Sequence, residues 1–344
     1  MRINAHGHVL PEPDEIPRFF KEKNVLWIDN DRSFMRNANW ARPITDDSFF
    51  LDEKFKWMEE NNIDHEVILN LSQLYCNGME RQLAQDVIRF QNDYNARIMH
   101  EHPDKLTCGF VVQPLHLNDA LREVERCVEQ LKMPLLCLPS HYSDLEDNWY
   151  SVADEKVDPI WELADKYGLA VEIHPYDGDR IIKLRNEYWR FHLIWMCALT
   201  ADTYHVHTLR GLPDKFENTR VCYAHGNQFG QVNFGRRLQG FKGRPDLFEG
   251  TRSPEDYKGH DNIYFDTLVH DVDVLKLMLD RHGVSQIVAG LDDPYPLGEM
   301  ATVENCFPGK VLQEALDRKY ITHENYDHIW YDNICRWLNK SFEN

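Results

Sequence analysis

The sequence predicts an α/β protein whose fold is a (β/α)₈ TIM-like barrel. About eight short apolar runs alternate with segments of helical periodicity, and several of these runs end in His or Asp. The chain has 344 residues, which is enough for one large domain with a buried core. We therefore expect a single barrel domain over residues 1–344, with functional groups on the loops that follow the strands.

The first strand is expected at the start of the chain and ends in His6-Gly7-His8. An irregular stretch over about residues 10–45 follows it. Proline interrupts this stretch at several positions, and it is too long for a simple connection, so we interpret it as an insertion beside the site. A helix is then predicted from near Thr45, which offers an N-cap, to about Asn62.

Strands and helices alternate through the rest of the chain. The patterns predict strands at residues 66–71, 107–112, 134–138, 169–174, 221–225, 263–266 and 286–290. They predict helices or helical regions at residues 82–102, 120–131, 159–167, 187–210 and 272–282. A second insertion follows the sixth strand, and about residues 309–344 are expected to form C-terminal closing helices.

Composition narrows the classes of partner. The formal net charge is −19, which disfavours nucleic acid and anionic membrane surfaces, since both require a basic footprint. An anionic substrate would need a local positive site built from a metal and a few arginines. The sequence contains neither an apolar run of eighteen residues nor the pattern of a secretory leader, so we expect a cytoplasmic protein.

Five residues at the ends of predicted strands are candidate site residues. His6 and His8 point to the same side of an extended segment, so they can share one metal ion. His174 ends the fifth strand, His225 ends the sixth, and Asp292 lies just past the eighth. Any one of them alone would more often be a hydrogen-bonded structural residue. In a barrel, however, all five project into the same mouth.

The chemistry of these side chains suits a catalytic zinc ion. Imidazole and carboxylate ligands with one open position are typical of such sites, where the metal activates water. Five candidates exceed what a tetrahedral site needs, so we expect at least one of them to transfer protons. His225 is our choice, because the open loop Gly226-Asn227-Gln228 follows it. His205 and His207 lie in a predicted helix, where residues two apart do not share a face, and we discount them as ligands.

Several motifs resemble those of a known family. His6-Gly7-His8, His174-Pro175, Ala224-His225-Gly226 and Gly290-Leu291-Asp292 look like the metal site of the amidohydrolase superfamily. More narrowly, the chain is similar over nearly its whole length to the zinc-dependent non-oxidative decarboxylases related to α-amino-β-carboxymuconate-ε-semialdehyde decarboxylase. The most specific stretches are 244–247, 266–271 and 294–299.

This resemblance implies a ligand set and a mechanism. His6, His8, His174 and Asp292 would bind one divalent metal, most simply Zn²⁺, and a water molecule would complete the site. His225 would take a proton from that water and help to deliver it to the carbon that loses carbon dioxide. His225 and Asp292 are therefore the predicted catalytic residues.

The resemblance also implies a pair of substrate-binding arginines in a homodimer. Arg236 falls where the family places an arginine that crosses the dimer interface to hold the substrate carboxylate. A second arginine should come from the first insertion, where Arg36 is the best match and Arg32 is the alternative. A guanidinium group suits this task because it pairs with a carboxylate through two parallel hydrogen bonds.

The chain departs from the family pattern near the expected pocket. Phe191-His192 replaces a Pro-Trp pair, and Leu291 and Asp293 replace the Thr and Tyr that usually flank the metal-binding Asp. Asp293 either faces the pocket, where it would disfavour a dianionic substrate, or faces away into a structural pairing. Trp189 is a candidate for stacking on a planar substrate, although aromatics at helical spacing are more often part of a core.

The sequence thus predicts a zinc-dependent decarboxylase of a small unsaturated or aromatic carboxylate. A hydrolase or hydratase on the same metal site is the first alternative, because activated water serves all three reactions. The second alternative is a catalytically silent binding or scaffold protein that keeps the fold. Manganese or iron could replace zinc, since His and carboxylate ligands accept several metals.

Overall fold

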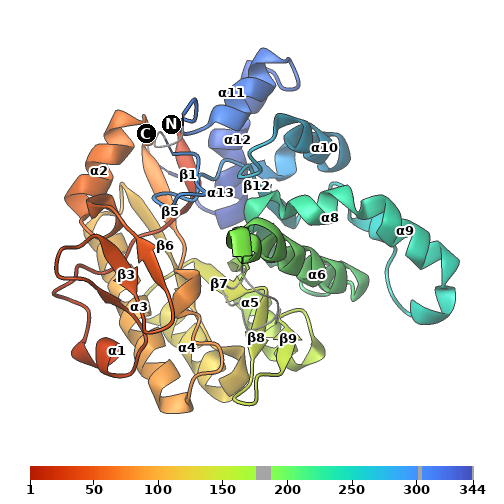
Figure 1. Ribbon diagram of the computed structural model, residues 1–344. Helices are drawn as coiled ribbons and strands as arrows, with labels where there is room; N and C mark the ends of the chain where they lie inside the picture. Colours follow the sequence, from red (N-terminus) through yellow and green to blue (C-terminus); the bar gives the residue numbers. More distant parts are fainter. Residues whose placement is uncertain (176–186, 301–303, 343–344) are drawn as a thin grey trace.

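A computed structural model of the chain describes residues 1–175, 187–300 and 304–342. Eight parallel strands form one sheet in the order β1-β5-β6-β7-β10-β11-β12-β13. Backbone contacts join the two ends of this sheet: Ala5 N–H donates to Ala289 O at 2.7 Å, and Gly7 forms an isolated parallel bridge with Asp293. The sheet therefore closes into a barrel surrounded by helices, which confirms the predicted fold (Figure 1).

The barrel strands follow the predicted apolar runs with small shifts at their ends. Their bounds are β1 (Ile3–Gly7), β5 (His65–Ile68), β6 (Leu106–Val111), β7 (Leu135–Pro139), β10 (Ala170–His174), β11 (Arg220–Tyr223), β12 (Ile263–Asp266) and β13 (Ile287–Val288). Nearly every residue in them is buried, as expected for parallel strands covered by helices outside and side chains inside.

Helices occupy the predicted segments. Those around the barrel include α2 (Leu51–Glu60), α3 (Arg81–Glu101), α4 (Leu117–Glu129), α5 (Asp158–Tyr167), α6 (Met196–Leu209), α8 (Gln228–Val232) and α10 (Val272–His282). The closing helices are α11 (Lys310–Asp317), α12 (His323–Trp330) and α13 (Asp332–Leu338). Helix α2 begins later than predicted, because Thr45 caps a separate short turn at Asp46–Ser48.

The first insertion is more regular than its sequence suggests. It contains a short helix, α1 (Arg18–Glu22), and a three-stranded antiparallel sheet of β2 (Trp27–Ile28), β3 (Phe34–Arg36) and β4 (Ala41–Pro43). The expectation of an irregular stretch was wrong here, because strands of two or three residues are too short to show an alternating pattern. This small sheet stands in front of the barrel in Figure 1.

Two further excursions lie on other sides of the barrel. A hairpin of β8 (His141–Ser143) and β9 (Trp149–Ser151) follows strand β7. The second insertion carries α8 and α9 (Phe234–Gly243), and α9 extends away from the barrel (Figure 1). Across the described residues, we find no helix with the length and apolarity that a membrane crossing requires.

Candidate metal centre

The structure brings all five strand-end candidates together at one end of the barrel. His6 and His8 come from β1 and the residue after it, His174 is the last residue of β10, and His225 follows β11. Asp292 comes from the loop after β13. Donor atoms of His6, His8 and Asp292 lie within 4.8 Å of one another, and so do those of His6, His174 and His225.

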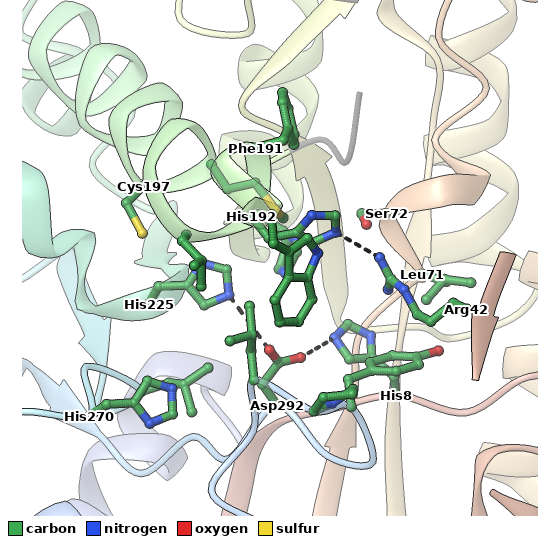
Figure 2. Close-up of a pocket in the computed structure, with 18 of the residues that line it drawn as sticks. His8, Arg42, Leu71, Ser72, Phe191, His192, Cys197, His225, His270 and Asp292 are labelled. Carbon is green, nitrogen blue, oxygen red and sulfur yellow. Dashed lines mark hydrogen bonds and ion pairs between the residues drawn. The ribbon is translucent and has the colours of Figure 1, made fainter. Parts of the chain in front are cut away.

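The distances are those of a compact donor cluster. His8 Nε2 lies 3.2 Å from both His6 Nε2 and Asp292 Oδ1, and His6 Nε2 lies 3.6 Å from the same oxygen. His225 stands slightly further off, with its Nε2 3.9 Å from Asp292 Oδ2. Figure 2 shows the carboxylate of Asp292 between the rings of His8 and His225.

Hydrogen bonds orient three of the imidazoles for metal binding. Nδ1 of His6 is 2.8 Å from Asp266 Oδ2, Nδ1 of His8 is 3.2 Å from Leu69 O, and Nδ1 of His174 is 2.8 Å from Pro175 O. All three partners are acceptors, so each Nδ1 carries a proton and Nε2 is left as the nitrogen of each ring that can bind a metal. Three such imidazoles and a carboxylate in a buried cluster fit a divalent cation such as zinc.

The electrostatics of the cluster favour a bound cation. Burial lowers the pKa of His6, but the hydrogen bond to Asp266 and the charge of Asp292 outweigh it and raise the pKa to about 9. Burial opposes ionisation of Asp292 as well, yet the hydrogen bond with His8 and the nearby imidazoles hold its pKa well below the usual range. The cluster thus attracts positive charge, and a metal would displace the proton that His6 otherwise keeps.

Asp266 is a residue of this site that we did not single out from the sequence. Besides His6, its carboxylate accepts the backbone N–H groups of Gly226 at 2.8 Å and His225 at 3.0 Å. His225 and Gly226 have φ values of +55° and +57°, so this carboxylate fixes a left-handed turn. The signal was present in the sequence, because Asp266 ends a predicted strand as the other candidates do.

A cavity of about 630 Å³ opens above the cluster. Its lining includes His8, His174, His225 and Asp292, together with aromatic side chains from the first insertion and from residues 189–192. Figure 2 shows Phe191 and His192 on the upper side of this cavity and Asp292 and His8 below. The aromatic residues that line it are Trp40, Trp189, Phe191, His192 and Tyr295. Such walls suit a planar organic ligand.

The arginines of the first insertion take different positions. Arg42 of β4 lines the cavity, where its guanidinium donates to His192 Nε2 at 2.9 Å and lies 5.3 Å from the centre of the Tyr295 ring. Arg36 pairs with Asp29 at 2.7 Å and is not among the cavity-lining residues. Arg42 faces Met35 across the sheet, so Arg36, the next residue after Met35, points to the opposite face.

The other two arginines also lie outside the cavity of this chain. Arg32 stacks over the ring of Phe50, with its Cζ 5.2 Å from the ring centre. Arg236 is exposed on α9, and its role across a dimer interface stays a prediction. Trp189 lines the cavity as predicted for a stacking residue, and its ring centre lies 5.0 Å from that of His192.

The structure decides which way Asp293 faces. Its carboxylate is fully buried and pairs with Lys54 and Asn4, away from the cavity. The sequence had left this structural pairing open as an alternative. His207, which we discounted as a ligand, lies on α6 with its Nδ1 2.8 Å from the hydroxyl of Tyr223.

The fold and the donor cluster together are those of a barrel protein with a candidate metal centre at the ends of its strands. A model of the amidohydrolase family matches residues 3–305. The chain therefore belongs to the amidohydrolase family.

Individual similar proteins have more specific names than the family. The chain is 27% identical over 339 residues to a curated protein of Dictyostelium discoideum named 2-amino-3-carboxymuconate-6-semialdehyde decarboxylase, and the match covers 94% of this chain and 89% of that protein. Among solved structures it is similar to 5-carboxyvanillate decarboxylase from Sphingomonas paucimobilis, with a TM-score of 0.77, 18% identity and 99% of both chains covered. A dihydroxybenzoic acid decarboxylase from Polaromonas, with bound manganese, matches with a TM-score of 0.70 and 15% identity over 98% of this chain and 96% of that one.

Proposed function

We propose that this protein is a metal-dependent carboxy-lyase that removes carbon dioxide, without oxidation, from a small aromatic or unsaturated carboxylate. The observation that carries the proposal is the donor cluster beside an aromatic-walled cavity. Ligand atoms of His6, His8 and Asp292 lie within 4.8 Å of one another, His174 joins His6 in a second such group, and His8, His174 and Asp292 line the cavity. The decarboxylase names of the similar proteins favour this reaction over others in the family.

We assign His6, His8, His174 and Asp292 as the ligands of one divalent metal, with Zn²⁺ as the proposed ion. The manganese in a similar structure supports a divalent metal in general. When bound, the metal would polarise a substrate oxygen and activate water. Asp266 would hold His6 in the tautomer that leaves Nε2 free for the metal.

His225 is the proposed proton carrier. Burial lowers its pKa to about 4, so its imidazole is neutral at pH 7 and can accept a proton at Nε2. Its backbone is held by Asp266, and its ring centre lies 5.0 Å from that of His174. Protonation of the carbon that loses carbon dioxide would take place from this nitrogen.

Arg42 is the proposed carboxylate-binding group within this chain, in the place that we had assigned to Arg36. It lies on the cavity wall, and its guanidinium can pair with a carboxylate through two parallel hydrogen bonds. Trp189 and the other aromatic walls would hold the planar part of the substrate and exclude water from it.

We also propose a homodimer in which Arg236 reaches the neighbouring subunit's cavity. The exposure of Arg236 on the extending helix α9 supports this arrangement. Sedimentation at several protein concentrations tests it, and a strictly monomeric protein with full activity would contradict it.

A hydrolase or hydratase on the same site is the second candidate, and the family assignment favours keeping it. Product analysis in ¹⁸O-labelled water separates the reactions. Decarboxylation releases carbon dioxide and adds no label to the organic product, whereas hydrolysis or hydration places labelled oxygen in it.

The metal content of the purified protein tests the proposal most directly. We expect about one zinc ion per chain in the wild type and loss of it in both His174→Ala and Asp292→Ala. Wild-type protein that neither contains nor takes up a divalent metal would overturn the proposed function and leave a binding or scaffold role.

A further inference from the structure

A second buried polar cluster lies directly behind the metal-binding segment. Lys54 of α2, Glu66 of β5 and Asp293 have fully buried side chains. Lys54 Nζ contacts Asp293 Oδ2 and lies 3.1 Å from Glu66 Oε2. Asn4 of β1 donates to both carboxylates, at 2.7 Å to Glu66 and 2.6 Å to Asp293. One ammonium thus joins two carboxylates that lie far apart in the sequence.

This cluster is tied to the backbone between the proposed metal ligands. The Nζ of Lys54 is 3.4 Å from His8 O, and His8 N–H donates to Asp293 O at 2.9 Å. Asn4 Oδ1 accepts the N–H groups of His6 and Leu291, both at 3.0 Å. These contacts fasten both segments that supply His6, His8 and Asp292.

The fit around Gly7 shows how closely the two segments meet. A Cβ atom on Gly7 would lie 2.5 Å from Glu66 Oε1, so only glycine allows the backbone between the two histidines to pass this carboxylate. Asp292 N–H also donates to His6 O at 2.7 Å, next to the same contact. The positions of the ligands therefore depend on where the cluster places the backbone.

The ammonium of Lys54 offsets the repulsion between the two buried carboxylates. Two buried carboxylates side by side would repel each other, and burial alone would disfavour every charge in the cluster. Lys54 places its ammonium between them, in contact with Asp293 and 3.1 Å from Glu66.

We propose that Lys54 is a positioning residue for the metal centre, acting through Asp293, Glu66 and Asn4 on the backbone of His6, His8 and Asp292. The inference rests on the ligands assigned in the proposed function. Lys54 lies behind the segment that carries the donors, so its effect on the metal passes through the position of the ligands.

The zinc affinity of Lys54→Met tests this role. Competition with a chelating dye measures the zinc Kd of the folded protein, and circular dichroism confirms folding. We expect the Kd to rise about 10- to 100-fold, which is the usual cost of removing support from metal ligands. Lys54→Arg keeps the positive charge and should recover most of the affinity.

A matched core variant separates positioning from general stability. Val124 is fully buried on α4, a helix that carries none of the proposed ligands. Val124→Ala should lower the thermal midpoint and leave the zinc Kd unchanged. If Lys54→Met behaves in the same way, with a lower midpoint and wild-type zinc affinity, Lys54 is merely structural and the proposal is overturned.

A further variant keeps the proposal testable if Lys54→Met does not fold. Asp293→Asn retains the ammonium and Glu66 but offers one acceptor oxygen instead of two to Lys54 and Asn4. A rise in zinc Kd supports the proposal, and an unchanged Kd overturns it. Wild-type protein without zinc affinity would instead overturn the proposed function and this inference with it.

Discussion

Asp292 and Asp293 are consecutive buried carboxylates that face opposite sides of the same loop. Asp292 faces the barrel mouth, where its neighbours are the imidazoles of His6, His8 and His225. Asp293 faces the seam of the barrel, where the ammonium of Lys54 meets it. Asp293 pairs with a cation of the chain itself, the ammonium of Lys54. The imidazoles around Asp292 instead suit a metal cation from solution.

The largest expected effect comes from exchanging each carboxylate for its amide. Asp292→Asn should lose the metal and about 10⁴-fold in kcat/KM, because the metal supplies several kcal/mol to the transition state. Asp293→Asn should bind zinc more weakly but still hold it at stoichiometric concentrations, and it should lose about 1–3 kcal/mol of unfolding free energy. Metal analysis, steady-state kinetics and urea unfolding measure these losses. Similar losses of metal in both variants would abolish the distinction.

His225→Gln sharpens the assignment of roles at the barrel mouth. The variant should retain the metal and lose about 10²- to 10³-fold in kcat, because glutamine cannot carry a proton. Single-turnover kinetics with metal-loaded protein check this, with the exposed His100→Gln on α3 as the control. A metal-free His225→Gln would make this residue a ligand instead of a proton carrier.

Arg42→Met and Arg36→Met compare the two faces of the small sheet. Arg42→Met should raise KM about 10- to 100-fold, because a charged hydrogen bond to substrate contributes about 1.5–3 kcal/mol. Arg36→Met should leave KM nearly unchanged, since its guanidinium pairs with Asp29 outside the cavity. A larger effect at Arg36 would restore the assignment made from sequence.

Histidines outside the site extend the comparison to acid stability. Burial lowers the pKa of His207 and His282 to about 3, so the folded protein keeps both neutral. Between pH 7 and pH 5 the unfolded chain binds protons that the folded chain does not, so stability falls as the pH falls. Each histidine should account for about 2 kcal/mol of the loss at pH 5.

His207→Gln tests this share. Urea unfolding of the metal-free protein at pH 7 and pH 5 should show a drop that is smaller by about 2 kcal/mol than in the wild type. An equal drop in His207→Gln would show that His207 is not neutral in the folded protein.

The strand ends explain why much of the site could be predicted. The apolar run of a buried strand shows where the strand ends, and the parallel strands of a barrel all end on the same side. His174, His225 and Asp292 therefore had to meet His6 and His8. Asp266 followed the same rule and was missed, because its side chain supports a ligand and does not itself belong to the ligand pattern. The small sheet of the first insertion was missed because its strands are too short to show a period.

The sequence by itself determined the barrel, the order of its strands and the five polar residues at their ends, because burial and alternation are local properties of each segment. Only the tertiary structure decided which face the neighbouring residues take. Arg42 and not Arg36 reaches the cavity because of the register of β3 and β4, and Asp293 turns inward because Lys54, 239 positions away, lies behind it. Pairing between the short strands sets the first orientation and a contact between distant segments sets the second, and the sequence pattern of a single segment records neither.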